Sequence, residues 1–212
     1  IRTNAKVTTL TAHAHGVDIT VGADTYSADA LIVAAGAWSG PLLEQTGLSL
    51  PLRQVRKTFA WFEAAEEVFN DEVFPAFAFD TPAGYYYGFP SIAQAGLKIG
   101  RHDGGTSVDP NQPRRPFGQE TGDLADLQQF TNTFMPSIDT LAHGKTCLYT
   151  MTPDEDFIID LHPDYPHIAI AAGFSGHGFK FSSLVGKVLS ELIMERSTTE
   201  PIGPFAIKRF AK

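Results

Sequence analysis

Alternation of apolar and polar residues dominates the start of the chain. Residues 7–11 and 17–21 alternate on either side of a turn at 14–16, which predicts a β-hairpin, and Gly22-Ala-Asp24 marks another turn. The segment 30–36 is continuously apolar instead, which is typical of a strand covered on both faces, as in parallel sheets. The first 36 residues therefore predict part of an α/β layer.

A second sheet is expected to begin after Pro51. Residues 52–63 alternate over a length that favours a long antiparallel strand. Further strands are expected at 76–79, 85–89 and 97–101. Aromatic residues crowd this block, which is typical either of a wall that lines an apolar ligand site or of a well-filled core. The sequence leaves both interpretations open.

The remaining pattern mixes a loop, helices and strands. A long loop is expected at 103–122, a surface helix at 123–134 and strands at 146–151 and 157–161. A buried strand at 168–173 is followed by a helix with one apolar stripe between Phe181 and Ile193. We therefore expect an α+β/α/β fold, with an antiparallel or mixed sheet in its middle part.

Composition and charge narrow the possible functions. The 212 residues are 43% hydrophobic and 19% charged, as in a soluble globular chain. A net charge of −8 argues against nucleic acid and anionic membranes as partners. No apolar run reaches the ~20 residues of a bilayer span, and no signal peptide is visible, so we expect a cytoplasmic protein whose beginning is missing. The single cysteine and the histidine spacing indicate no disulfide and no metal site.

Lys98 is the most unusual charged residue of the expected strands. A period of two puts Lys98, Gly100 and His102 on one face and the apolar Leu97 and Ile99 on the other. A buried ammonium must be paired or have a lowered pKa, which is how reactive lysines arise. The alternative is an edge-strand lysine that prevents aggregation. His102 on its own is more typical of a structural imidazole.

A glycine-rich turn, Gly173-Phe-Ser-Gly-His-Gly-Phe-Lys180, joins the last strand to the last helix. Such a turn directs backbone N–H groups toward a ligand, although here it matches neither a Walker A motif nor GxGxxG. The alternative is a tight turn in which glycines relieve crowding. Cys147 and Tyr149 share one face of a strand, and a free cysteine is by default an inert, buried residue.

Five segments together carry a family resemblance. They are Tyr86-Tyr-Gly-Phe-Pro90, Leu97-Lys-Ile-Gly-Arg-His102, Cys147-x-Tyr149, Pro153-Asp-Glu-Asp-Phe-Ile-Ile-Asp160 and 173–183. In this order they resemble the C-terminal half of the monomeric sarcosine oxidase and N-methyltryptophan oxidase family. The segments 55–61 and 98–105 resemble the N-methyltryptophan oxidase branch more closely.

The resemblance implies an FAD-dependent amine oxidase. Such an enzyme oxidises the secondary amine of an N-methyl amino acid with O2, giving H2O2, formaldehyde and the free amine. By matching position, Cys147 would be joined covalently to the flavin, Lys98 would promote the reaction with oxygen, and Lys180 would bind the substrate carboxylate.

The resemblance also assigns the remaining site residues. Tyr87, His102 and Tyr149 would line the substrate cavity. The residues expected to contact FAD, besides Cys147, are Gly176, His177, Gly178, Ala35, Gly36 and Trp38. Residues 1–50 with 152–212 would form the C-terminal part of an FAD-binding domain, and 51–151 the substrate domain.

The family's GxGxxG fingerprint is absent from this sequence. It belongs to an N-terminal half of about 150 residues, which is the expected partner of this chain. We therefore expect the chain alone to be an inactive fragment. The alternatives are a non-catalytic module that binds a small acid or a partner without a cofactor, and a relative of glycine oxidase with noncovalent flavin.

Overall fold

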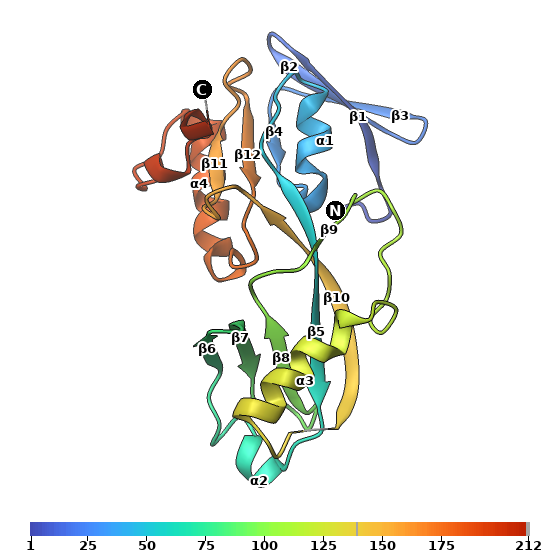
Figure 1. Cartoon of the computed structure of the whole chain (residues 1–212). Coiled ribbons are helices and arrows are strands. Elements are labelled where there is room, and N and C mark those ends of the chain that lie inside the picture. Colours follow the sequence, from blue (N-terminus) through green and yellow to red (C-terminus); the bar gives the residue numbers. More distant parts are fainter. Residues whose placement is uncertain (139, 211–212) are drawn as a thin grey trace. The chain divides into compact units, whose positions relative to one another are not determined.

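The computed structural model describes residues 1–138 and 140–210, and these form two compact units. Unit 1 comprises residues 1–54 and 149–212, of which the last two are not described, and unit 2 comprises residues 55–148. Figure 1 shows the elements of both units. None of the helices in the described residues is long and apolar enough to cross a membrane.

Unit 1 begins with an antiparallel three-stranded sheet of β1 (Val7–His13), β2 (Gly16–Val21) and β3 (Asp24–Ala28). The hairpin predicted around residues 14–16 is confirmed by the pairing of His13 with Gly16. The third strand was missed because all five of its residues are exposed, so it carries no apolar alternation.

A second sheet of unit 1 has the order β11-β12-β4, from β4 (Leu31–Val33), β11 (Ile158–Leu161) and β12 (Ile168–Ala172). β12 pairs in parallel with β4 and antiparallel with β11, so the sheet is mixed. All five residues of β12 are buried, which confirms the continuous apolar pattern of this segment.

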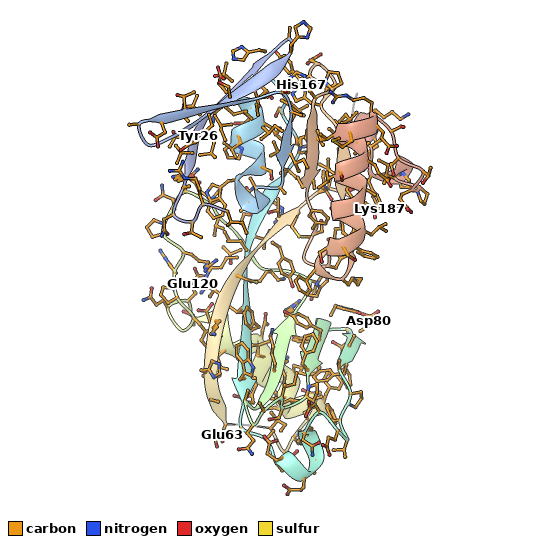
Figure 2. The ribbon with its side chains drawn as sticks, turned by 180° about the vertical axis from the view of Figure 1, so that it is seen from behind. Tyr26, Glu63, Asp80, Glu120, His167 and Lys187 are labelled. Carbon is orange, nitrogen blue, oxygen red and sulfur yellow. The ribbon has the colours of Figure 1, made fainter. Side chains whose placement is uncertain are left out.

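Helices cover both faces of this sheet. α4 (Ser182–Glu195) packs Val188, Leu189 and Leu192 on one face, and Lys187 lies on its solvent side (Figure 2). On the other face, Leu43 of α1 (Ser39–Glu44) joins the core with residues of β1 and β2. Short 3-10 helices lie at Gly36–Trp38, Phe179–Phe181, Gly203–Phe205 and Ile207–Phe210.

Unit 2 is built on a sheet with the order β10-β5-β8-β7-β6. Its strands are β5 (Arg53–Phe62), β6 (Phe77–Thr81), β7 (Gly84–Phe89), β8 (Leu97–Arg101), β9 (Thr106–Ser107) and β10 (Leu141–Met151). β9 pairs with β5 beside the main path. The ladders that join β5 to β8, β8 to β7 and β7 to β6 are antiparallel, which confirms the expected sheet type.

One face of this sheet packs against α3 (Gly122–Phe134), and α2 (Glu66–Phe69) lies after β5 (Figure 1). Phe62, Leu97, Ile99, Leu127 and Phe130 fill the core, each at most 2% exposed. The surface helix predicted at 123–134 is confirmed: Leu127 and Phe130 are buried on one side, whereas Asp126, Gln129 and Asn132 are exposed on the other.

A buried ion pair fixes the start of α3 to β5. Both Arg56 and Asp123 have side chains that are 4% exposed, and the guanidinium donates to both carboxylate oxygens, at 2.6 and 2.8 Å. Arg56 also donates to the carbonyls of Arg115 and Pro116, while Asp123 accepts the N–H of Gly118. The irregular segment before α3, on which Glu120 is labelled in Figure 2, is thereby held to the sheet.

We expect Arg56→Ala to lower the free energy of unfolding by about 3–5 kcal/mol, because it leaves the carboxylate of Asp123 buried and uncompensated. The pair lowers the pKa of Asp123, so its contribution is complete above the ordinary pKa of aspartate and is lost as the pH falls through the lowered value. Urea unfolding of both proteins at several pH values measures the difference in the free energy of unfolding and its dependence on pH.

The control is Arg2→Ala, which removes an exposed pair with Asp24 and should cost less than about 1 kcal/mol. Equal losses in the two variants would contradict a structural role for the buried pair.

Candidate active site

The sheet of unit 2 has a second face, opposite α3, which we call the open face. Its residues are Lys57, Phe59, Trp61, Tyr87, Phe89, Lys98, Gly100, His102, His143, Lys145 and Cys147. The aromatic block of the sequence is therefore divided: Phe62 and Tyr86 belong to the core, whereas Phe59, Trp61 and Phe89 lie on the open face. The interpretation as a core is confirmed for Phe62 and Tyr86, whereas the interpretation as a ligand-site wall stays a prediction for the aromatic residues of the open face.

Lys98 lies in the interior of the sheet, since β8 is between β5 and β7. The alternative of an edge-strand lysine is therefore wrong. Its Nζ lies 4.6 Å from the ring centroid of Phe59, 5.2 Å from that of Trp61 and 5.4 Å from that of Phe89. Burial, aided by the neighbouring charge of Lys145, lowers the pKa of Lys98. The arrangement presents a cation whose hydration is partly replaced by aromatic rings.

Tyr87 on β7 lies opposite the glycine of the neighbouring strand β8. The register pairs Tyr87 with Gly100, and a Cβ at Gly100 would come within 2.8 Å of the Tyr87 hydroxyl oxygen. A larger residue would therefore displace the tyrosine ring. Glycine at this position lets the phenol lie against the strand two residues from Lys98, on the same face.

His102 directly follows β8 on the open face. Its backbone N–H donates to the carbonyl of Tyr85 at 2.8 Å, and its ring meets that of Tyr85 edge-on with centroids 5.8 Å apart. Its carbonyl accepts a hydrogen bond of 2.8 Å from Nζ of Lys57. The position of His102 is therefore set by backbone contacts on both of its sides.

Cys147 lies on β10, next to β5, and is partly buried. Burial raises the pKa of its thiol, and the positive charges of Arg114, Lys57 and Lys98 oppose that rise. Cys147 is the one cysteine of the sequence. Burial outweighs the three positive charges, so the pKa of its thiol lies above the ordinary value.

The glycine-rich turn of unit 1 is held in a left-handed backbone conformation. Gly173, Ser175 and Gly176 have φ values of +62°, +48° and +81°. The buried hydroxyl of Ser175 donates to the carbonyl of Gly173 at 3.2 Å and accepts the N–H of Thr152 at 3.3 Å. Tyr149 packs against Gly176 so closely that a Cβ there would overlap its ring. The turn is therefore a rigid loop rather than a flexible one.

His177 and Lys180 complete this turn. Nδ1 of His177 lies 3.2 Å from the carbonyl oxygen of Ser175, and its ring lies 4.8 Å from that of Phe157. Lys180 is exposed, and its Nζ donates to the carbonyl of His177 at 3.0 Å. A 3-10 turn, Phe179–Phe181, separates Gly178 from α4, so the helix does not begin directly after the glycines.

Ala35, Gly36 and Trp38 directly follow β4. Because β4 and β12 are parallel neighbours, the segment after β4 and the glycine-rich turn after β12 leave the sheet at the same edge. Gly36 has φ of +54°, and Trp38 is 43% exposed. Crevices at the carboxyl ends of parallel strands are the usual ligand sites of such sheets.

The structure thus gathers the predicted residues into two groups. Tyr87, Lys98, His102 and Cys147 share the open face of unit 2, while Tyr149, Gly176, His177, Gly178 and Lys180 share the turn region of unit 1. Sequence reasoning missed Lys57, Trp61, His143 and Lys145 on the open face. The period of two in 52–63 was the signal for Lys57 and Trp61, since it puts both on the face of Phe59.

Comparisons with known proteins show the family of the chain. Residues 1–192 match the family model of the FAD dependent oxidoreductases, DAO. The chain belongs to the DAO family. Over 195 residues it is 44% identical to the monomeric sarcosine oxidase of Arthrobacter sp. (strain TE1826), with 91% of this chain and 50% of the relative covered.

It is 37% identical over 208 residues to the N-methyl-L-tryptophan oxidase of Yersinia pestis (strain Pestoides F), covering 98% of this chain and 55% of that relative. The chain spans about half the length of the curated relatives that it matches. The two segments 55–61 and 98–105 favoured the N-methyltryptophan oxidase branch. Over the whole matched length, however, the sequence identity is higher to the sarcosine oxidase, at 44% against 37%.

Solved structures show the same fold. The glycine oxidase of Geobacillus kaustophilus superimposes with a TM-score of 0.78 at 22% identity, over 98% of this chain and 53% of that chain. The L-proline dehydrogenase of P. horikoshii does so with a TM-score of 0.81 at 19% identity, over 97% and 54%. At these identities the likeness shows the fold alone, and it confirms the predicted fold class.

Residues 1–138 and 140–210 contain no group of three or more His, Cys, Asp or Glu side chains placed to hold a metal ion. In unit 1 the exposed Gly176, with a positive φ, lies beside Tyr149, and in unit 2 the open face presents the ammonium of Lys98 among aromatic rings. Backbone N–H groups and a cation are hydrogen-bond donors, which fit a flavin better than they fit a metal.

We expect Gly176→Ala to lower the free energy of unfolding by about 1–3 kcal/mol, because its Cβ would meet the ring of Tyr149 at a φ of +81°. Gly186→Ala is the matched control, since nothing lies within 4 Å of the added Cβ and alanine favours a helix. Denaturant unfolding of both variants measures the difference. A Gly176→Ala variant as stable as the control would contradict the close packing of this turn.

Proposed function

We propose that the protein oxidises the secondary amine of an N-methyl amino acid. The balanced reaction is that the N-methyl amine, O2 and water give the free amine, formaldehyde and H2O2. The names of two relatives, monomeric sarcosine oxidase and N-methyl-L-tryptophan oxidase, support this class of substrate. FAD, when bound, would accept a hydride equivalent from the amine and pass two electrons to O2.

One observation carries the proposal: Lys98 holds its ammonium among aromatic rings on the same open face as Cys147. A fixed cation in such a place stabilises negative charge that develops on oxygen as it is reduced. The partial replacement of water by Phe59 and Trp61 strengthens this effect, because the local dielectric is lower than that of bulk solvent.

Cys147 is the proposed point of covalent attachment. Its thiolate would form a thioether with the flavin 8α-methyl group, in which one C–H bond of the methyl group is replaced by a C–S bond. Counted from the thiol, this releases two protons, one from sulfur and one from the methyl group, and two electrons, which O2 takes up as H2O2. The charges of Arg114, Lys57 and Lys98 favour the thiolate that this step requires and partly offset the burial that raises the pKa of the thiol.

The other residues of the two groups have roles in binding. Tyr87, His102 and Tyr149 would contact the substrate, and Lys180 would bind its carboxylate. Glycines at 176 and 178, with His177, would bring backbone N–H groups to the flavin ring, while Ala35, Gly36 and Trp38 would contact its adenosine part. In this proposal 51–151 is the substrate domain, and 1–50 with 152–212 belong to the FAD-binding domain.

A partner segment completes the proposal. β4 is a strand of three residues at the edge of its sheet, with Ile32 44% exposed. Such an apolar, unpaired edge is a template for a further strand. We propose that the half of the family length not covered by this chain supplies that strand and the GxGxxG cradle, and that the 212 residues alone do not turn over.

We expect Cys147→Ser in the complete protein to release its flavin. The hydroxyl of serine does not replace a thiolate as nucleophile at neutral pH, so no thioether forms. After acid precipitation, the unaltered protein should keep its yellow colour in the pellet, whereas the variant should leave it in the supernatant. Colour that washes out of both would indicate noncovalent flavin, and a folded, colourless complete protein would indicate a binding module without cofactor.

We expect Lys98→Met to slow reoxidation of the reduced flavin by about 100-fold or more, and its anaerobic reduction by substrate far less. Stopped-flow absorbance resolves the two steps. Because burial lowers the pKa of Lys98, the reoxidation rate of the unaltered protein should fall as the pH rises through that lowered value. Equal slowing of both steps would contradict the role of Lys98 in the oxygen reaction.

A further inference from the structure

Lys57 is a charged residue that neither the proposed reaction nor the core accounts for. It lies in the middle of β5 on the open face, yet it is only 4% exposed. β5 pairs with β8 at Phe59 and with β9 at Arg56, and the segment 102–105 that joins β8 to β9 passes over Lys57. This segment supplies the hydrogen-bond partners of the side chain.

The ammonium of Lys57 binds three consecutive carbonyl oxygens. Nζ donates to the carbonyl of His102 at 2.8 Å, to that of Asp103, and to that of Gly104 at 3.0 Å. A protonated lysine has three N–H donors, and this arrangement uses all of them, whereas a neutral amine has two. The segment is thus shaped around a cation.

The segment closes tightly on the lysine. Gly105 has φ of +95°, and a Cβ there would lie 2.9 Å from Cδ of Lys57 and 2.8 Å from the carbonyl oxygen of Arg56. Only glycine permits this approach. The lysine stem and the segment therefore fix each other, and the first residue of the segment is His102.

The charge of Lys57 also acts on β10. Lys57 and Cys147 interact electrostatically, and the thiol is under the further influence of Arg114 and Lys98. Around Lys57 itself, Asp103 and Asp126 favour its charged form, and Arg101 opposes it. Burial is the largest influence and lowers the pKa of Lys57 to about 8.

We propose that Lys57 is a positioning residue of the active site, whose buried ammonium holds His102 in place through the carbonyls of 102–104. This inference rests on the proposed function, in which His102 contacts the substrate. It adds a residue that touches neither flavin nor substrate and acts through another.

Alkylation of the thiol tests the charge. Cys147 is the only cysteine, so the rate at which iodoacetamide modifies the 212-residue chain reports its thiolate fraction at each pH. We expect Lys57→Met and Lys57→Gln to slow alkylation at pH 8 by about threefold to tenfold and to move the profile to higher pH. Lys6→Met, an exposed lysine of unit 1, is the control and should leave the profile unchanged.

Amide hydrogen exchange tests the anchor. Exchange in the segment 102–105 should become about tenfold faster or more in Lys57→Met, which has no donors, and less so in Lys57→Gln, which keeps two N–H groups. If Lys57→Met fails to fold, Lys57→Gln decides both measurements. An alkylation profile or an exchange rate at the unaltered value, in a variant with unaltered circular dichroism, would overturn the proposal.

The two proposals fail separately. Alkylation and hydrogen exchange use no flavin, so they test Lys57 even if Cys147→Ser retains the covalent colour and the attachment site is elsewhere. Conversely, unaltered alkylation profiles and exchange rates in both Lys57 variants would contradict the role of Lys57. They would not contradict covalent attachment of the flavin to Cys147.

Discussion

The two-residue period of an antiparallel sheet separates two kinds of chemistry in unit 2. In β8, Leu97 and Ile99 point into the core beneath α3, while Lys98 and Gly100 point to the open face. A shift of one residue would bury the ammonium of Lys98 and expose the core. The stability of the unit and the chemistry of its open face are therefore fixed by the same register.

The same alternation in β5 directs two neighbouring cations, Arg56 and Lys57, to opposite faces of the sheet, where they bind different groups. Arg56 points to α3 and forms a buried ion pair with Asp123, which holds the segment before the helix. Lys57 points to the open face and binds the carbonyls of 102–104. Neighbouring residues of one strand thus fix two irregular segments, one on each face, and the second of these carries His102.

Much of this arrangement could be predicted from the sequence, because alternation and continuous apolar runs are local signals. The faces of β8, the buried β12 and the helix that follows it are examples. β3 could not be predicted, since it is an exposed strand held by pairing with β2. β10 begins at Leu141, five residues before the expected start, because its exposed first half is fixed by the neighbouring β5.

The site shows the same limit. The sequence placed Lys98 and His102 on one face, but two of the three carbonyls around Lys57, those of Asp103 and Gly104, come from a segment expected only as a loop. Hydrogen bonds between residues more than 40 positions apart carry no local signal. Which of two adjacent cations becomes an ion pair and which a carbonyl ligand depends on tertiary packing.

The central claim is that the open face of unit 2 lies against the flavin ring. The most direct measurement is the electron density of the flavin in crystals of the complete, FAD-loaded protein. The account predicts a ring in contact with the side chain of Lys98 and joined to Sγ of Cys147. Flavin density remote from this face, with Cys147 as a free thiol, would contradict it.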